Sequence, residues 1–167
     1  MSQPDFLDEL GELALGSRIK RLGDRMMAEA GRTYAAFGHD AQPKWFALLA
    51  LLDRRGPVTV VEAAESLGLT QPAVSQFLRG LEERRWIQLG LDPTDGRKRV
   101  VRLSKRGRAE VAAMKPMWRA VDAAARELCE EAGGHLLEAL QRFEQALEQR
   151  SMAERALEHA HERASKD

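Results

Sequence analysis

Residues 58–103 contain, in a fixed order, the start and stop signals of two short helices and then those of a β-hairpin. This order constrains the fold more than any other feature of the chain. Thr59 followed three residues later by Glu62 is a capping box, and Gly68 suits the left-handed residue that ends a helix. The second helix has a capping threonine, a first-turn proline and an apolar stripe at Thr70, Pro72, Val74, Leu78 and Leu81. Two short helices joined by a tight turn predict a helix-turn-helix.

The residues after the second helix are typical of two strands joined by a tight turn. Apolar side chains alternate with other residues over 87–91 and again over 99–103, which is the period of half-buried strands. Between them, Asp92-Pro93-Thr94-Asp95-Gly96 places an aspartate, a proline and a glycine where a turn needs them. A hairpin directly after a helix-turn-helix predicts a winged helix, which we assign to residues 43–104.

Both ends of the chain are predicted to be helical. Apolar residues recur at steps of three and four over residues 15–37, with a break favoured near Gly16-Ser17. A long helix is predicted from Ser104 to about Glu131, and a further helix follows the glycine pair at 133–134. The fold class is therefore mainly α with a small β-hairpin wing.

The formal net charge of zero hides an uneven distribution along the chain. Residues 70–108 hold 10 basic and 4 acidic side chains, a net charge of +6, whereas residues 1–69 carry −2 and residues 109–167 carry −4. A basic module between acidic flanks attracts a polyanion locally. The winged helix is therefore expected to bind double-stranded DNA.

The second helix of the pair is the predicted reading element, because burial of its apolar stripe leaves a polar face outside. Glutamine and arginine side chains can make bidentate contacts to base edges in the major groove, and the other polar groups can hold phosphates. The predicted DNA-binding residues of this helix are Thr70, Gln71, Pro72, Ser75, Gln76 and Arg79. The alternative interpretation is a polar helix face that is merely solvated.

The hairpin carries the other predicted DNA contacts. Arginine suits the narrow minor groove, where the negative potential is strongest, and Arg97 stands just beyond the turn. Lys98 and Arg99 are expected to reach phosphates. The alternative is an ordinary solvated basic turn, and it loses force because the hairpin follows a helix-turn-helix.

These motifs resemble the MarR family of bacterial transcription regulators. The resemblance is carried by the helix-turn-helix at 58–84, the run Asp92-Pro93-x-Asp95-Gly96-Arg97, and the strand ending Val101-x-Leu103-Ser104-x-x-Gly107. More narrowly, PKWFALLALL, TQPAVSQ and MKPMW are similar to members whose regulator domain precedes an acetyltransferase domain, for which these 167 residues leave no room. The chain departs from the family at Arg85, near which a glycine is common, and a left-handed arginine there would be strained.

The resemblance implies a homodimer in which the terminal helices, residues 1–37 and 105–167, interlock while each subunit presents one winged helix. It implies a palindromic operator with half-sites about one helical turn apart, roughly 34 Å. Repression of transcription is expected. The acidic flanks fit this arrangement, because they would keep the dimerisation region away from DNA.

The resemblance also implies release from DNA by a small aromatic molecule bound between the two regions. The candidate lining residues are Met26, Tyr34, Trp45, Met114, Met117 and Trp118. Core packing is the competing explanation, since methionine and aromatic residues at helical spacing are commonly buried.

Other functions find little support in the sequence. Cys129 lies among acidic residues, which oppose the thiolate form, so an inert thiol is expected. No metal or other cofactor is predicted, and no phosphate loop or nucleophile–base pattern points to an enzyme. No membrane span or secretory signal is visible, so a cytoplasmic protein is expected. The alternative function is a winged-helix module that binds protein and has no specific affinity for DNA.

Overall fold

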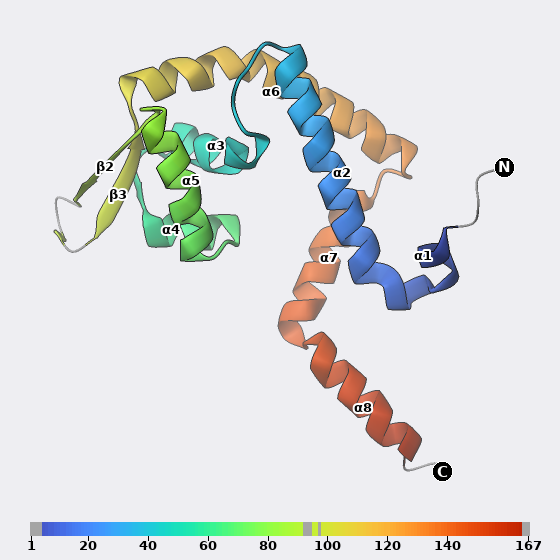
Figure 1. Ribbon diagram of the computed structural model, residues 1–167. Helices are drawn as coiled ribbons and strands as arrows, with labels where there is room; N and C mark the ends of the chain where they lie inside the picture. Colours follow the sequence, from blue (N-terminus) through green and yellow to red (C-terminus); the bar gives the residue numbers. More distant parts are fainter. Residues whose placement is uncertain (1–4, 92–94, 97, 165–167) are drawn as a thin grey trace. The chain divides into compact units, whose positions relative to one another are not determined.

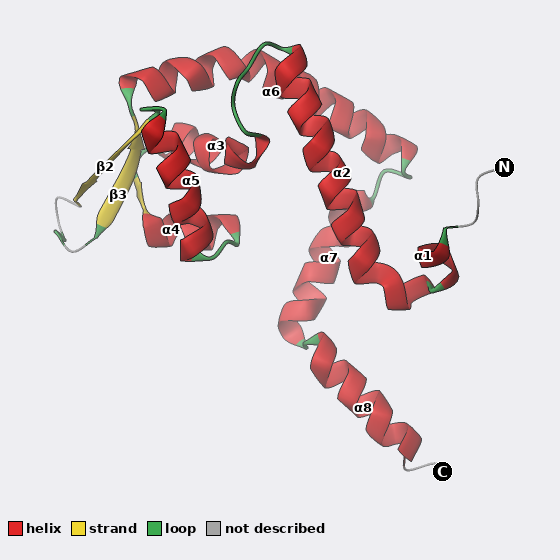
Figure 2. Cartoon of the chain, in the orientation of Figure 1, coloured by secondary structure: helices red, strands yellow, loops and turns green. Residues whose placement is uncertain are grey.

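The computed structural model describes residues 5–91, 95–96 and 98–164. Helices dominate the described chain (Figure 2). One small antiparallel sheet of three strands accompanies them. The predicted fold class is thereby confirmed. The chain forms two compact units, Met1–Met117 and Trp118–Asp167. No helix in the described stretches is both long and apolar enough to span a bilayer.

The first unit begins with three consecutive helical pieces: α1 (Phe6–Glu9), the 3-10 helix η1 (Gly11–Ala14) and α2 (Leu15–Ala36). The break predicted near Gly16-Ser17 lies slightly earlier: η1 ends at Ala14 and α2 begins at Leu15, and the chain also turns at Gly11, whose φ of 55° is left-handed. Gly16 lies inside α2, where a glycine on an exposed helix costs only about 1 kcal/mol relative to alanine.

The next elements along the chain are η2 (Pro43–Trp45), α3 (Phe46–Arg55), β1 (Val58–Thr59), α4 (Val60–Leu67) and α5 (Gln71–Glu83). The helices α4 and α5 form the helix-turn-helix. The capping box is complete: Thr59 Oγ1 accepts from the Glu62 N–H at 3.1 Å, and the Glu62 carboxylate accepts from the Thr59 N–H at 2.7 Å. Gly68 ends α4 in the left-handed conformation, and Thr70 Oγ1 accepts from the Ala73 N–H at 3.3 Å. The predicted helix signals are therefore confirmed.

The hairpin consists of β2 (Ile87–Leu91) and β3 (Arg99–Leu103), and the strand order in the sheet is β1-β3-β2. Leu89 pairs with Val101, and Leu91 pairs with Arg99. Successive side chains of a strand point to opposite faces, so Arg99 shares the face of the buried Val101 and Arg102 lies on the other face. The strand β1, which pairs Val58 with Val101 across the sheet, was not predicted from the sequence.

The core of the first unit lies where α3, α5, the sheet and the beginning of α6 (Lys105–Glu131) meet. Its largest fully buried side chains are Leu48, Leu49, Val74, Leu81, Val101, Val111, Met114 and Met117. Val74 and Leu81 belong to the apolar stripe predicted for α5. This packing fixes the buried side of α5 and leaves its polar side outward.

The second unit contains the last part of α6, then α7 (Leu136–Gln149) and α8 (Met152–Ala164). Gly133 and Gly134 have φ values of 97° and 81° and separate α6 from α7, as predicted.

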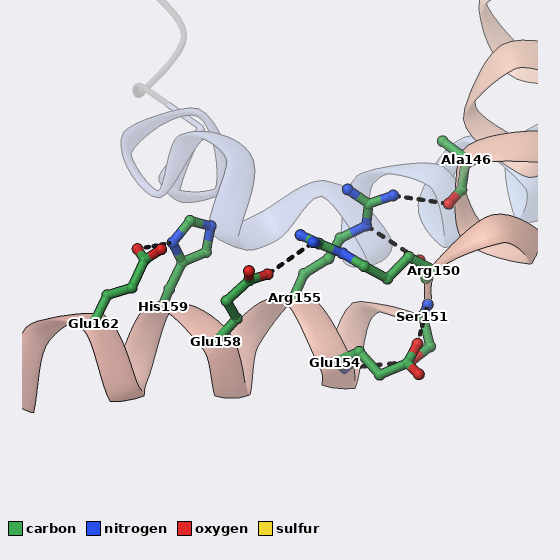
Figure 3. Close-up of polar contacts among 8 residues, drawn as sticks. All are labelled: Ala146, Arg150, Ser151, Glu154, Arg155, Glu158, His159 and Glu162. Atoms are coloured by element: carbon green, nitrogen blue, oxygen red, sulfur yellow. Dashed lines mark hydrogen bonds and ion pairs between the residues drawn. The ribbon is translucent and has the colours of Figure 1, made fainter.

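A cluster of polar contacts fixes the joint between α7 and α8 (Figure 3). The Arg155 guanidinium donates to the Ala146 and Arg150 carbonyls at 2.9 and 3.1 Å, so it satisfies backbone acceptors that the end of α7 leaves open. Arg150 forms an ion pair with Glu158 at 2.7 Å. Ser151 and Glu154 form a second capping box, and the hydrogen bonds from Ser151 hold the pKa of the Glu154 carboxyl below its ordinary value.

Arg85 links α5 to the hairpin in the left-handed conformation, with a φ of 60°, and it is the one non-glycine residue with positive φ in the described chain. Its carbonyl accepts from Ser104 Oγ at 2.7 Å, and the next carbonyl, of Trp86, accepts from the Ser104 N–H at 2.9 Å. The backbone strain expected from having arginine in place of glycine at residue 85 is therefore present. Two hydrogen bonds from Ser104 hold the backbone in this conformation.

We expect Arg85→Gly to stabilise the protein. A left-handed arginine costs roughly 1–2 kcal/mol, whereas a glycine loses about 0.5–1 kcal/mol more conformational freedom on folding. The Arg85 side chain is exposed, so the net gain in the free energy of unfolding should be about 0.5–1 kcal/mol. Urea denaturation followed by far-UV circular dichroism measures it. Glu83→Gly, at the last residue of α5, is the control and should lose up to about 1 kcal/mol; a loss in both variants would show that Arg85 is not strained.

Candidate nucleic-acid interface

The predicted reading face of α5 is exposed along its length. Val74, Leu78 and Leu81 are at most 4% exposed and anchor the helix, while the predicted contacts on its other side are open to solvent. Those exposed positions are Thr70, Gln71, Pro72, Ser75, Gln76 and Arg79. No ion pair joins Arg79 to any other residue that the structure describes. The face is therefore available to an outside partner.

The described part of the wing presents Lys98 and Arg99 to solvent. The backbone N–H of Lys98 donates to the Asp95 carbonyl at 2.9 Å, and the two side chains form a weak ion pair at 4.0 Å. Arg97, the predicted minor-groove residue, lies outside the described residues.

A hollow of about 850 Å³ lies between α5, the start of α4 and the hairpin, elements that neighbour one another in Figure 1. Its walls bring five of the nine predicted DNA-binding residues together: Gln71, Ser75, Arg79, Lys98 and Arg99. Thr70, Pro72 and Gln76 are exposed but do not line it. The other lining residues were not predicted as site residues from the sequence; they are Thr59, Val60, Val61, Glu62, Leu78, Glu82 and Leu89.

The six candidate effector residues do not line this hollow. Four of them are buried in the first unit, namely Tyr34, Trp45, Met114 and Met117. Met26 is 48% exposed on α2, and Trp118 belongs to the second unit. The effector pocket therefore stays a prediction.

Trp45 is buried and has the packing role that the sequence left open as the alternative to lining a pocket. Its ring meets that of Trp86 edge-on at a centroid distance of 6.1 Å, and the Arg84 guanidinium lies 5.3 Å from its centre. A methyl group on Gly80 of α5 would come within 2.7 Å of the Trp45 ring. Trp45 thus supports α5 from beneath.

The two remaining kinds of candidate site are a reactive cysteine and a metal site. Cys129 is a free, partly exposed thiol. Over residues 5–91, 95–96 and 98–164, histidine, cysteine and carboxylate side chains do not gather into a group that could hold a metal ion.

Comparison with known proteins finds a family model that matches part of the chain. Residues 39–98 match the model of the MarR family, so the match includes the helix-turn-helix and β2 and ends just before β3. No curated protein is similar enough in sequence to count as a match.

Solved structures extend the likeness to most of the chain. The transcriptional repressor CouR bound to a 23-mer DNA duplex is 27% identical, with a TM-score of 0.67 over 85% of this chain and 99% of that one. A probable transcriptional regulator from Pseudomonas aeruginosa is 26% identical, with a TM-score of 0.59 over 75% and 96%. A mutant MarR from E. coli, complexed with operator DNA, is 19% identical, with a TM-score of 0.65 over 83% and 96%.

The matched family and these neighbours are transcription regulators rather than enzymes, as the sequence analysis expects of this chain. The structural match covers almost the whole length of these neighbours, so the likeness includes helices beyond the helix-turn-helix. Residues 39–98 are therefore similar to the MarR family, and the fold of the chain is that of the MarR-type transcription regulators.

Proposed function

We propose that the protein is a dimeric, sequence-specific DNA-binding regulator that acts as a repressor from the cytoplasm. The observation that carries the proposal is the convergence of an exposed polar face of α5 and a basic hairpin on one hollow. With α5 in the major groove and the wing arginine in the minor groove, one subunit would read a half-site. The repressor CouR, a neighbour at 27% identity, was solved on a DNA duplex, which supports the same partner here.

The proposed dimer rests on apolar surface that one subunit leaves open. On α2, Ile19, Leu22 and Met26 recur at helical spacing and are 44%, 51% and 48% exposed. A contiguous apolar patch on a protein surface commonly marks an interaction site. We assign residues 1–37 and 105–167 to dimerisation and residues 43–104 to DNA binding. Two-fold symmetry would then require a palindromic operator.

Two finer points are proposed on the sequence alone. The first is release from DNA by a small aromatic effector, with the six lining residues given above. The second is the kinship with regulators that precede an acetyltransferase domain, which rests on three short sequence motifs.

Binding to duplex DNA at several salt concentrations tests the proposal. The logarithm of the affinity should fall linearly with the logarithm of the salt concentration, by about 0.9 per neutralised phosphate. Sequencing fragments selected from random DNA should yield a palindrome. Binding that is absent from all duplexes, or insensitive to salt, would instead favour the protein-interaction module.

We expect Arg97→Ala to weaken binding to all duplexes and to flatten the salt dependence by about one phosphate per subunit. Fluorescence anisotropy with a labelled duplex measures both effects. Arg102→Ala is a matched control on the same hairpin, because Arg102 hydrogen-bonds Gln88 at 3.2 Å on the strand face away from the hollow. Equal binding by both variants and the unaltered protein would remove the wing arginine from the mechanism.

A further inference from the structure

The hollow between α5 and the hairpin has cationic walls on two sides. Arg79 lines it from α5, and Lys98 and Arg99 line it from the hairpin. The acids on its walls are Glu62 and Glu82, and Glu62 is already engaged with the N–H and hydroxyl of Thr59 at 2.7 and 2.8 Å. The hollow therefore attracts an anion that is long enough to touch both walls.

The geometry of a duplex says which anion that is. The major and minor grooves are separated by a single sugar–phosphate strand. If α5 occupies one groove and the hairpin the neighbouring groove, that strand has to pass between them, and the space between them is this hollow of about 850 Å³.

We propose that the hollow seats one sugar–phosphate strand, with Arg79 and Arg99 holding its phosphates and Glu82 repelling them. This inference rests on the proposed function and deepens it. It gives Arg79 a phosphate contact in place of the base contact expected from the sequence. Base reading then falls to Gln76, which is exposed on α5 but does not line the hollow.

Glu82 is the unexpected member of the seat. It lies three residues after Arg79, so the two side chains project from one side of α5 into the same hollow. It is exposed, and no ion pair joins it to another residue within the described parts of the chain. A carboxylate that no ion pair holds, beside a phosphate path, lowers the affinity for every duplex, and contacts to the correct bases then decide which sites are occupied.

Two pairs of matched residues test the seat. Arg99 and Arg102 lie on one strand but on opposite faces, and only Arg99 lines the hollow. Glu82 and Glu83 are adjacent exposed residues of α5, and only Glu82 lines it. Each is changed to glutamine, which removes the charge and keeps most of the side chain.

Affinities of the full-length protein for an operator and for an unrelated duplex are measured from low to high salt. Arg99→Gln and Arg79→Gln should each weaken both affinities about tenfold at low salt and reduce the salt slope by about 0.9 per subunit. Arg102→Gln should change the affinities and the salt slope less than Arg99→Gln or Arg79→Gln does. Arg99→Lys, which keeps the charge, should retain the slope.

Glu82→Gln should tighten binding to both duplexes by roughly threefold to tenfold at low salt, with the gain fading as salt screens the charge. Glu83→Gln should leave binding unchanged. Gln76→Ala should relax the preference at one base position and leave the salt slope as it is. Thermal melts followed by circular dichroism confirm that each variant is folded.

The two proposals fail in different ways. If the unaltered protein shows no salt-dependent binding to any duplex, the DNA-binding function falls. If it binds DNA but Arg99→Gln matches Arg102→Gln and Glu82→Gln matches Glu83→Gln, the seat alone is overturned. Arg79→Gln that loses base preference with an unchanged slope would also overturn it, because Arg79 would then contact a base.

Discussion

Replacing Gly107 with alanine is expected to destabilise the first unit by about 3 kcal/mol, at the upper end of the usual cost of overpacking. A Cβ at this position would lie 1.8 Å from the Trp86 carbonyl oxygen and 2.7 Å from the carbonyl carbon. Both are backbone atoms, so no side-chain rotation relieves the clash. Gly107 therefore permits the beginning of α6 to lie directly against the base of the hairpin.

Hydrogen bonds prevent the Trp86 carbonyl from moving aside. It accepts from the Ser104 N–H at 2.9 Å, and Ser104 Oγ accepts from the Gly107 N–H at 2.9 Å while it donates to the Arg85 carbonyl. Any shift large enough to admit a methyl group breaks part of this network, which also holds the left-handed Arg85.

Chemical denaturation followed by circular dichroism gives the free energy of unfolding of Gly107→Ala. The matched control is Gly90→Ala in β2, where a Cβ would meet nothing within 4 Å and where alanine should be neutral or slightly stabilising. If Gly107→Ala is as stable as Gly90→Ala, the close approach of α6 to Trp86 is not present in the protein.

The parts of the fold that could be predicted are those coded by local signals. Capping boxes, the glycine at the end of α4 and the alternation of the hairpin each act over a few residues, and the structure reproduces them. The strain at Arg85 was anticipated from the resemblance to the MarR family, in which a glycine is common near this position, rather than from a local signal.

The parts that could not be predicted depend on residues far apart in the chain. The two-residue strand β1 is too short to show a period, and it exists because Val58 and Thr59 meet β3. Glu82 looks like one more acidic residue of α5 until the fold brings it into the same hollow as Lys98 and Arg99. Trp45 could not be distinguished from a pocket-lining residue until Gly80 and Trp86 were found against it.

Changing Leu22 to aspartate is expected to convert the proposed dimer into monomers and to lower operator affinity at least a hundredfold. Leu22 is half exposed at the centre of the apolar stripe of α2, so a monomer tolerates a carboxylate there. In a symmetric dimer the charge is buried twice. At about 2 kcal/mol or more for each buried polar group, the dimer dissociation constant should rise about a thousandfold.

The loss of operator affinity follows from the loss of the second winged helix. Joining two binding modules raises affinity by roughly 10²–10⁴ over one module alone, and a monomer forfeits that gain. Sedimentation velocity reports the oligomeric state, and anisotropy on whole and half operators reports the binding. Leu22→Asp should bind whole and half operators equally, whereas the unaltered protein should prefer the whole site.

Ser17→Asp is the control for this substitution, since it adds the same charge to an exposed position on the polar side of α2. It should remain dimeric and keep its preference for the whole operator. A Leu22→Asp protein that stays dimeric would place the interface elsewhere than the α2 stripe. If the unaltered protein sediments as a monomer and binds half operators as well as whole ones, each winged helix acts alone, and the palindrome has no physical reason to exist.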